Sequence, residues 1–168
     1  MRRLFSIVGW HNAGKTTLAE GLVREYRKRG ARVAVIKHSR EGFDIDHPGT
    51  DTWRLTEAGS DVVVIASKNA MAWLERPAQE LSLEQIVKRL DADIDVVIGE
   101  GFKHERGPKI EVLRLATGTE PIASADELLA IVTDDVTDPR PVPGFGFQEI
   151  VRLVDFLMDR GYGPRSRA

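Results

Sequence analysis

The chain of 168 residues contains no cysteine and carries little net charge. The absence of cysteine excludes disulfide bonds, thiolate zinc sites and thiol nucleophiles, and it is compatible with a reducing cytosol. The formal net charge is -2, and acidic and basic residues are interspersed. Nucleic acids and anionic membranes are bound through broad basic fields, which this pattern does not supply. We therefore expect no nucleic acid and no membrane among the partners.

The sequence also lacks a long hydrophobic run. The apolar stretch after Arg2 and Arg3 ends at Val8, which is too short for the core of a signal peptide. No stretch approaches the roughly 20 apolar residues that a membrane-spanning helix needs. These absences predict a cytoplasmic protein.

The length of the chain allows one good hydrophobic core, because single domains cluster around roughly 100 to 150 residues. We expect a single domain over residues 1–162. Residues 163–168 are small and basic, and we expect them to form a disordered tail.

The first elements alternate between strand and helix. Residues 4–8 and 32–36 are short apolar runs, and residues 16–29 between them carry apolar side chains at helical spacing. The two runs are continuous in apolarity, which is typical of parallel strands that are covered on both faces. The opening is therefore a βαβ unit.

The remainder of the chain continues in the same way. Buried strands are expected over 94–98 and 128–132, an edge strand over 109–115, and a close pair of strands over 61–66 and 70–74. Helices are expected over 51–58, 82–90 and 148–160. Because the close pair favours an antiparallel hairpin, we predict an α/β protein with a mostly parallel but mixed central sheet.

A glycine-rich motif lies between the first strand and the first helix. Residues 9–16 read Gly-Trp-His-Asn-Ala-Gly-Lys-Thr and fit the phosphate-binding pattern G-x-x-x-x-G-K-[ST]. Glycines allow successive backbone N–H groups to turn around a β-phosphate, and the helix that follows adds its positive dipole end. We expect Lys15 to contact the β- and γ-phosphates and the Thr16 hydroxyl to ligate magnesium. The motif predicts the three-layer P-loop NTPase fold.

The expected nucleotide site extends beyond these two residues. Lys37 leaves the second strand at its carboxyl end, the edge at which open α/β sheets bind ligands. Asp134 follows another buried strand, where a carboxylate could face a base or merely form a turn. We assign to the site Gly9, His11, Asn12, Ala13, Gly14, Lys15, Thr16, Thr17, Lys37 and Asp134.

Three carboxylates compete for the magnesium ion and for the attacking water. Glu100 follows the strand over 94–98, and Asp44 and Asp46 lie in the polar loop after the second strand. Such loops often contact the γ-phosphate and the metal in nucleotide switches. We expect Thr16, Asp44 and Glu100 to hold magnesium, and Asp46 and Glu100 to act in hydrolysis. The alternative is that these side chains are ordinary solvated carboxylates.

Cations and histidines gather near the same sheet edge. Lys103, Arg106 and Lys109 follow Glu100 and favour anion binding. A transition-metal site could be built from the histidines, although no pair has the helical i, i+4 spacing of a dedicated site. These histidines are His11, His38, His47 and His104.

Two tryptophans lie in the same part of the chain. Trp10 is in the P-loop and Trp53 follows the polar loop. Either ring could stack on a base or a pterin, but packing is the more common role of a tryptophan near a helix start. Packing is therefore the interpretation that the sequence favours for both.

Together with the P-loop, three further blocks make the chain resemble the MobB family of molybdopterin-guanine dinucleotide biosynthesis adapter proteins. The blocks are residues 43–51 (F-D-x-D-x-x-G-x-D), 99–103 (G-E-G-F-K) and 108–112. The resemblance extends to about residue 160. One departure concerns residues 39–42, Ser-Arg-Glu-Gly, where many members have a further histidine. A role of that histidine does not carry over to this chain.

The resemblance implies a function. Members of the family are usually dimeric, bind GTP and magnesium, hydrolyse GTP slowly, and assist the guanylyltransferase that attaches GMP to the molybdenum-bound pterin. It therefore implies a homodimer with the guanylyltransferase, and with molybdopterin or its insertion enzyme, as partners. By match, Gly14, Lys15 and Thr16 carry over as nucleotide residues, and Asp44, Asp46 and Glu100 as acidic positions.

The residues alone leave other functions open. The N-K-x-D signature that reads guanine in Ras-like GTPases is absent, and so are an obvious water-orienting glutamine and a clear arginine finger. Slow hydrolysis is the expectation. A P-loop small-molecule kinase and a metallochaperone GTPase for nickel enzymes are the alternatives, although we find no arginine-rich lid and no cysteine.

Overall fold

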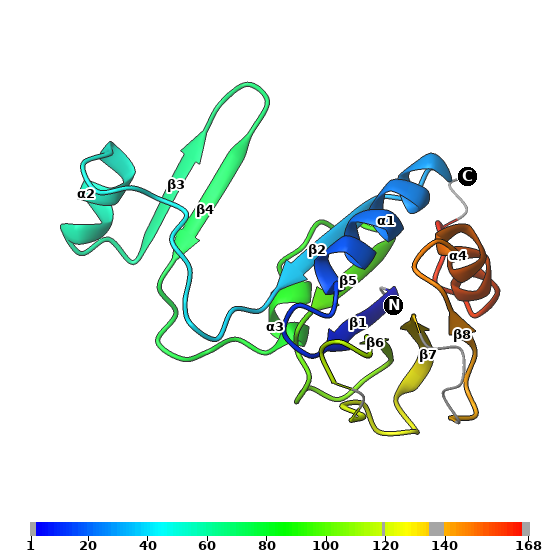
Figure 1. The fold of residues 1–168 in the computed structure, drawn as a ribbon. Coiled ribbons are helices and arrows are strands. Elements are labelled where there is room, and N and C mark those ends of the chain that lie inside the picture. Colours follow the sequence, from blue (N-terminus) through cyan, green and yellow to red (C-terminus); the bar gives the residue numbers. More distant parts are fainter. Residues whose placement is uncertain (1–2, 119, 135–139, 166–168) are drawn as a thin grey trace. The chain divides into compact units, whose positions relative to one another are not determined.

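The structure is a computed structural model that describes residues 3–118, 120–134 and 140–165. Backbone contacts divide the chain into two compact units (Figure 1). The first unit comprises Met1–His38 and Leu83–Ala168, and the second comprises Ser39–Ser82. The span 1–162 that we expected to form a single domain contains both units, so one folding domain stays a prediction.

The large sheet of the first unit has parallel neighbours throughout its described part. It consists of β1 (Arg3–Gly9), β2 (Val33–Lys37), β5 (Val96–Glu100), β6 (Lys109–Leu113), β7 (Leu128–Thr133) and β8 (Gly144–Phe145). The strand order is β2-β5-β1-β6-β7-β8. All carboxyl ends therefore meet at one edge, where ligands bind in open parallel sheets.

The second unit carries its own small sheet. Strands β3 (Val62–Ala66) and β4 (Met71–Glu75) pair antiparallel in a two-stranded sheet that is separate from the large one. The hairpin was predicted correctly, but the mixed central sheet is wrong. Sequence spacing shows that two strands pair with each other, whereas it does not show which sheet they join. The α/β fold of the P-loop class is confirmed.

Strand β6 is central, although its alternating charges predicted an edge strand. It lies between β1 and β7, and all five of its residues are buried. Lys109 Nζ contacts Glu127 Oε2 at 2.6 Å, and Arg140 Nη1 contacts Glu111 Oε2 at 2.5 Å. Charged side chains can occupy a covered strand when each is paired. The edge prediction failed because these partners lie far away in sequence.

The Lys109–Glu127 pair predicts a pH effect on stability. Hydrogen bonds, chiefly from Lys109, lower the pKa of Glu127 from 4.5 to about 2. A carboxyl with a depressed native pKa stabilises the fold above its ordinary pKa and loses this effect as the pH falls towards its native pKa. In urea unfolding we expect Glu127→Gln to be less stable than the unchanged chain near neutral pH, and the difference to shrink as the pH falls from 4.5 towards about 2.

A matched control for this experiment is Glu84→Gln, which removes an exposed carboxylate from an i, i+4 pair with Lys88. Exposed pairs contribute little, so this variant should follow the unchanged chain at every pH. A stability difference for Glu127→Gln that stays constant with pH would contradict the assigned pKa.

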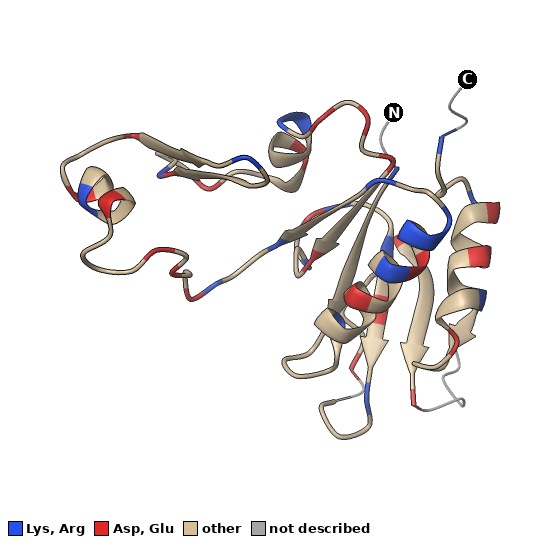
Figure 2. Cartoon of the chain, turned by 90° about the horizontal axis from the view of Figure 1, so that it is seen from above, with Lys and Arg blue, Asp and Glu red and all other residues tan. Residues whose placement is uncertain are grey.

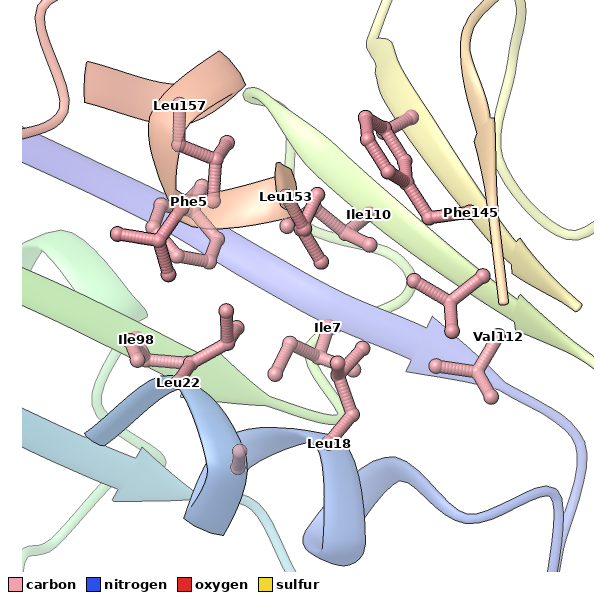
Figure 3. Packing of buried hydrophobic residues seen from close by; sticks show 14 of the residues in the cluster. Phe5, Ile7, Leu18, Leu22, Ile98, Ile110, Val112, Phe145, Leu153 and Leu157 are labelled. Atoms are coloured by element: carbon pink, nitrogen blue, oxygen red, sulfur yellow. The ribbon is translucent and has the colours of Figure 1, made fainter. Parts of the chain in front are cut away.

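Helices cover both faces of the large sheet. On one face, α1 (Lys15–Lys28) and α4 (Ile150–Asp159) bury Leu18, Leu22, Leu153 and Leu157 against side chains of β1, β5 and β6 (Figure 3). On the other face, α3 (Leu83–Lys88) packs through Leu83 and Val87. Figure 2 shows charges of both signs on α1 and α4. Helix α2 (Asp51–Glu57) belongs to the second unit. Within the described residues, no helix is long and apolar enough to span a membrane.

The described part of the C-terminal tail makes defined contacts. The Gly163 carbonyl accepts from Arg3, and the Arg165 N–H donates to Asp95 Oδ1 at 3.1 Å. Asp95 is buried, and its other carboxylate oxygen accepts from Arg32 N at 2.7 Å. The expected disorder therefore does not hold for residues 163–165, and residues 166–168 lie outside the described part.

Candidate nucleotide and magnesium site

The loop between β1 and α1 has a backbone path that few side chains permit. A Cβ on Gly9 would lie 2.5 Å from the Val112 carbonyl oxygen, so the neighbouring strand excludes any larger residue. Gly14 has a φ of +98° and Asn12 a φ of 59°, which are left-handed values that glycine and asparagine tolerate best. The loop is therefore bent tightly around the start of α1, as the motif predicted.

The N-terminus of α1 is prepared for an anion. Gly14 is the N-cap, without a capping side chain, and the first turn contains no acidic residue. Thr16 and Thr17 in that turn are exposed, as are His11 and Asn12 in the loop, whereas Ala13 is buried. The N–H groups of a first turn and the helix dipole favour a phosphate at such a position.

The lysine of the motif lies folded over the loop. Lys15 Nζ donates to the carbonyl oxygens of Gly9 at 3.1 Å and Trp10 at 2.7 Å. Burial lowers the pKa of Lys15, Glu100 opposes this effect, and Lys37 and Lys103 add to it. The Lys37 and Lys103 ammonium groups are thus close enough to act on the charge of Lys15. A polyanion would relieve their repulsion.

Glu100 meets the P-loop threonine at the carboxyl edge of the sheet. The Thr16 hydroxyl donates to Glu100 Oε1 at 2.8 Å, and Lys37 Nζ lies 3.2 Å from the same oxygen and 3.4 Å from Thr16 Oγ1. Glu100 is 5% exposed. Lys37 pairs with Glu100 in the β2–β5 register, and Glu100 with Ile7 in the β5–β1 register. Parallel pairing of three strands therefore brings these side chains together.

This arrangement fits a magnesium ion. Hydroxyl and carboxylate oxygens are the ligands that magnesium prefers, and Thr16 and Glu100 supply one of each. The Lys37 ammonium lies within 3.4 Å of both oxygens, so a positive charge already lies next to them. Bound magnesium would neutralise the phosphate oxygens of a nucleotide.

The basic segment after Glu100 is only partly as expected. Lys103 contributes to the positive environment of Lys15. Lys109, however, is 2% exposed and its ammonium is bound by Glu127 and by the Glu105 carbonyl. The prediction that Lys109 binds an anion is wrong, because the charge is already neutralised inside the sheet.

Asp44 and Asp46 belong to the second unit. Asp46 Oδ1 accepts from the Thr50 hydroxyl at 2.6 Å, and this bond chiefly lowers the pKa of Asp46. Thr50 in turn caps α2 by accepting from Trp53 N at 3.2 Å. Asp46 thus shapes the turn before α2, and the metal and catalytic roles of Asp44 and Asp46 stay predictions.

Trp10 is 37% exposed, so its packing and stacking roles both stay predictions. Its Nε1 donates to the Glu120 carbonyl at 3.0 Å, and the ring approaches Gly118. His38 packs its ring against Phe102, with 5.3 Å between ring centroids. Among the described residues there is no group of three His, Asp or Glu side chains that could hold a metal ion.

Two side chains next to the P-loop, Arg114 and Phe147, were not predicted from the sequence, whereas Asp134 was. Arg114 follows β6 and donates from Nε to the Ala13 carbonyl at 3.1 Å, and its guanidinium carbon lies 4.2 Å from the Phe147 ring centroid. Asp134 follows β7, is exposed, and accepts from Leu115 N at 3.2 Å. Asp135 lies outside the described residues. The position of Arg114 directly after a buried strand was the one signal available in the sequence.

A parallel sheet whose first strand leads through this loop into α1, with Lys15 and Thr16 at the helix start, defines a P-loop α/β protein. The family model described as Molybdopterin guanine dinucleotide synthesis protein B (MobB) matches residues 4–134. The chain belongs to this family, which confirms the resemblance seen in the sequence.

Comparison with individual relatives supports the same family. A molybdopterin-guanine dinucleotide biosynthesis adapter protein of Haemophilus influenzae is 39% identical over 133 residues, or 78% of this chain and 74% of the relative. The protein with that name in Escherichia coli is 32% identical over 160 residues, or 93% and 91%. A tetraacyldisaccharide 4'-kinase of Haemophilus influenzae is 30% identical over 93 residues, which span 28% of that kinase.

Solved structures support the fold. A crystal structure of molybdopterin-guanine biosynthesis protein B aligns with a TM-score of 0.72 at 30% identity and covers 94% of this chain and 99% of its own. The crystal structure of Bacillus subtilis MobB aligns with a TM-score of 0.72 at 22% identity, covering 98% and 99%. At 22% identity the likeness concerns the fold alone.

Proposed function

We propose that this protein is a GTP-binding adapter with slow GTPase activity that assists synthesis of the molybdopterin guanine dinucleotide form of the molybdenum cofactor. Membership of the MobB family supports the pathway. The contact of Thr16 and Glu100 beside Lys15 and Lys37 is the observation that supports binding of a magnesium–triphosphate complex.

Each residue of the site has a distinct task in this proposal. The N–H groups at the start of α1 and the Lys15 ammonium bind the β- and γ-phosphates. Thr16 and Glu100 hold magnesium, and Lys37 moves from their oxygens to a phosphate. Lys37 and Lys103 both act on the charge of Lys15, and these three cations supply the local positive charge that a triphosphate requires.

Slow turnover is expected because the proposed role of Glu100 is to hold magnesium beside Thr16. A carboxylate engaged in this way is a weak candidate for taking a proton from water. Asp46 is the proposed second carboxylate for orienting water. A protein that keeps its nucleotide is suited to presenting it to the guanylyltransferase, and we propose that enzyme, with molybdopterin or its insertion enzyme, as partners in the cytoplasm.

Calorimetric titration with GTP, ATP and their diphosphates, with and without magnesium, tests the nucleotide part. Tight binding of GTP with magnesium and weak binding of ATP would support the adapter. Rapid phosphate transfer to an added small acceptor would instead favour a P-loop kinase, and one partial relative is named a kinase. A pull-down from lysate with and without GTP tests the partners, and molybdenum-cofactor enzymes should be retained.

The hairpin of the second unit supports the proposed homodimer. Val64 and Trp73 are paired across β3 and β4, with Val62 and Met71 on the same face of the ribbon. These four side chains are 37% to 70% exposed. A two-stranded ribbon is marginally stable by itself, so a second copy covering this face would bury its apolar area.

The dimer makes a testable prediction at Trp73. We expect Trp73→Glu to convert a dimer into a monomer of 18.7 kDa in sedimentation at micromolar concentration, because a charge would be buried in the apolar contact. Lys68→Glu, in the turn between β3 and β4, is the matched control and should leave the dimer intact. Equal masses for the Trp73 variant and the unchanged chain would contradict this interface.

A further inference from the structure

The strand order separates the two ends of a bound nucleotide. Glu100, the proposed magnesium ligand, ends β5, and Lys37, the proposed phosphate contact, ends β2; both strands lie on one side of β1. Strands β6, β7 and β8 lie on the other side of β1. A triphosphate that places its γ-phosphate and metal beside Glu100 and crosses the P-loop must direct its nucleoside towards the carboxyl ends of β6 to β8.

Arg114 lies at the carboxyl end of β6 and contacts the P-loop. It follows β6, is half-buried, and donates from Nε to the Ala13 carbonyl at 3.1 Å. A Cβ on Gly14 would lie 3.5 Å from both Arg114 Nε and Nη2. The guanidinium is therefore next to the last glycine before the phosphate-binding lysine.

An aromatic ring and a carboxylate accompany this arginine. The Phe147 ring, after β8, lies 4.2 Å from the guanidinium carbon and 3.2 Å from the Cβ that Gly14 lacks. A ring that supports a guanidinium fixes its plane. Asp134, after β7, is bonded through Oδ1 to the N–H of Leu115, the residue next to Arg114.

We infer that Arg114, supported by Phe147, is the platform on which the purine base of the bound nucleotide stacks, with Asp134 facing the polar edge of the base. The inference rests on the proposed nucleotide binding and adds the residues that recognise the base. Planar guanidinium groups stack on π-systems, and a carboxylate accepts from the ring N–H and amino donors of guanine. The planarity of the guanidinium group is the property that this stacking requires.

The test compares two probes that share a triphosphate chain but differ in having a nucleoside. Calorimetry measures binding of magnesium–GTP and of magnesium–tripolyphosphate to the full chain, to Arg114→Ala and to Arg114→Lys. Stacking of a base contributes about 10-fold to 100-fold in affinity, so we expect both variants to lose this factor for GTP and less than about 3-fold for tripolyphosphate. Arg114→Lys keeps a donor for the Ala13 carbonyl but loses the planar group.

The variants need controls for folding and charge. Thermal unfolding shows whether each variant is folded, and Arg24→Ala removes an arginine of α1 whose ion pair with Glu20 is exposed at the surface. Equal losses for both probes would make Arg114 a support of the P-loop alone and overturn the inference, as would unchanged GTP affinity in Arg114→Lys. If the unchanged chain binds tripolyphosphate and GTP equally, the base platform is wrong while phosphate binding stands. If it binds neither, the proposed function fails as well.

Discussion

Replacing Lys15 with alanine is expected to lower the affinity for magnesium–GTP by about 100-fold or more, because it removes the cation that faces two phosphates. In the structure this ammonium is held by the Gly9 and Trp10 carbonyls, directly above the loop that would receive the phosphates. On nucleotide binding, Lys15 would exchange these backbone oxygens for phosphate oxygens. Isothermal titration calorimetry measures the loss.

The matched control is Lys28→Ala on the same helix, where the ammonium is exposed and lies 3.5 Å from Glu25. It changes the net charge equally but is far from the N-terminus of α1, so it should bind GTP like the unchanged chain. Thermal unfolding of both variants separates a binding effect from loss of fold. Unchanged GTP affinity in folded Lys15→Ala would refute the assignment of the site.

Glu100→Gln is expected to remove most of the magnesium dependence of nucleotide binding. The substitution keeps the shape of the side chain and an acceptor for the Thr16 hydroxyl, which now lies 2.8 Å away, but it removes the negative charge. Because Lys37 pairs with the same oxygen at 3.2 Å, the variant also leaves an uncompensated ammonium that competes with the metal. We expect the gain in GTP affinity on adding magnesium to fall by about 10-fold.

Asp46→Asn is the comparison that decides between the candidate carboxylates. Asp46 organises the turn before α2 through Thr50, so its variant is expected to weaken that turn and to leave most of the magnesium dependence. The measurement is GTP affinity over a series of magnesium concentrations for both variants. If the magnesium dependence survives in Glu100→Gln but disappears in Asp46→Asn, the metal ligand is Asp46 of the second unit and not Glu100.

Prediction from the sequence succeeded where one local stretch contains the determining interactions. The strand before Gly9 and the helix after Gly14 follow from apolar periodicity and from the backbone demands of the loop, and both are present. The position of Glu100 was predicted because the carboxyl ends of parallel strands meet at one edge of the sheet. A carboxylate at the end of a buried strand therefore lies near the P-loop.

Prediction failed where a distant partner decided the outcome. The charges of Lys109 and Glu111 indicate a solvated edge until Glu127 and Arg140 are found beside them in space. The hairpin of β3 and β4 was visible in the sequence, but its separation from the large sheet was not. Arg114 and Phe147 are 33 positions apart in the chain and meet only after β6 to β8 have assembled.

The sequence by itself determined that this protein is a P-loop protein, because Gly9, Gly14, Lys15 and Thr16 lie within one short loop, and the blocks at 43–51, 99–103 and 108–112 indicated the MobB family. Only the tertiary structure decided what surrounds that turn. It placed Glu100 and Lys37 beside Thr16 on one side of β1 and Arg114 and Phe147 on the opposite side. The physical reason is that a phosphate-binding loop depends on local dihedral angles, whereas the walls of the site depend on the order in which separate strands pair.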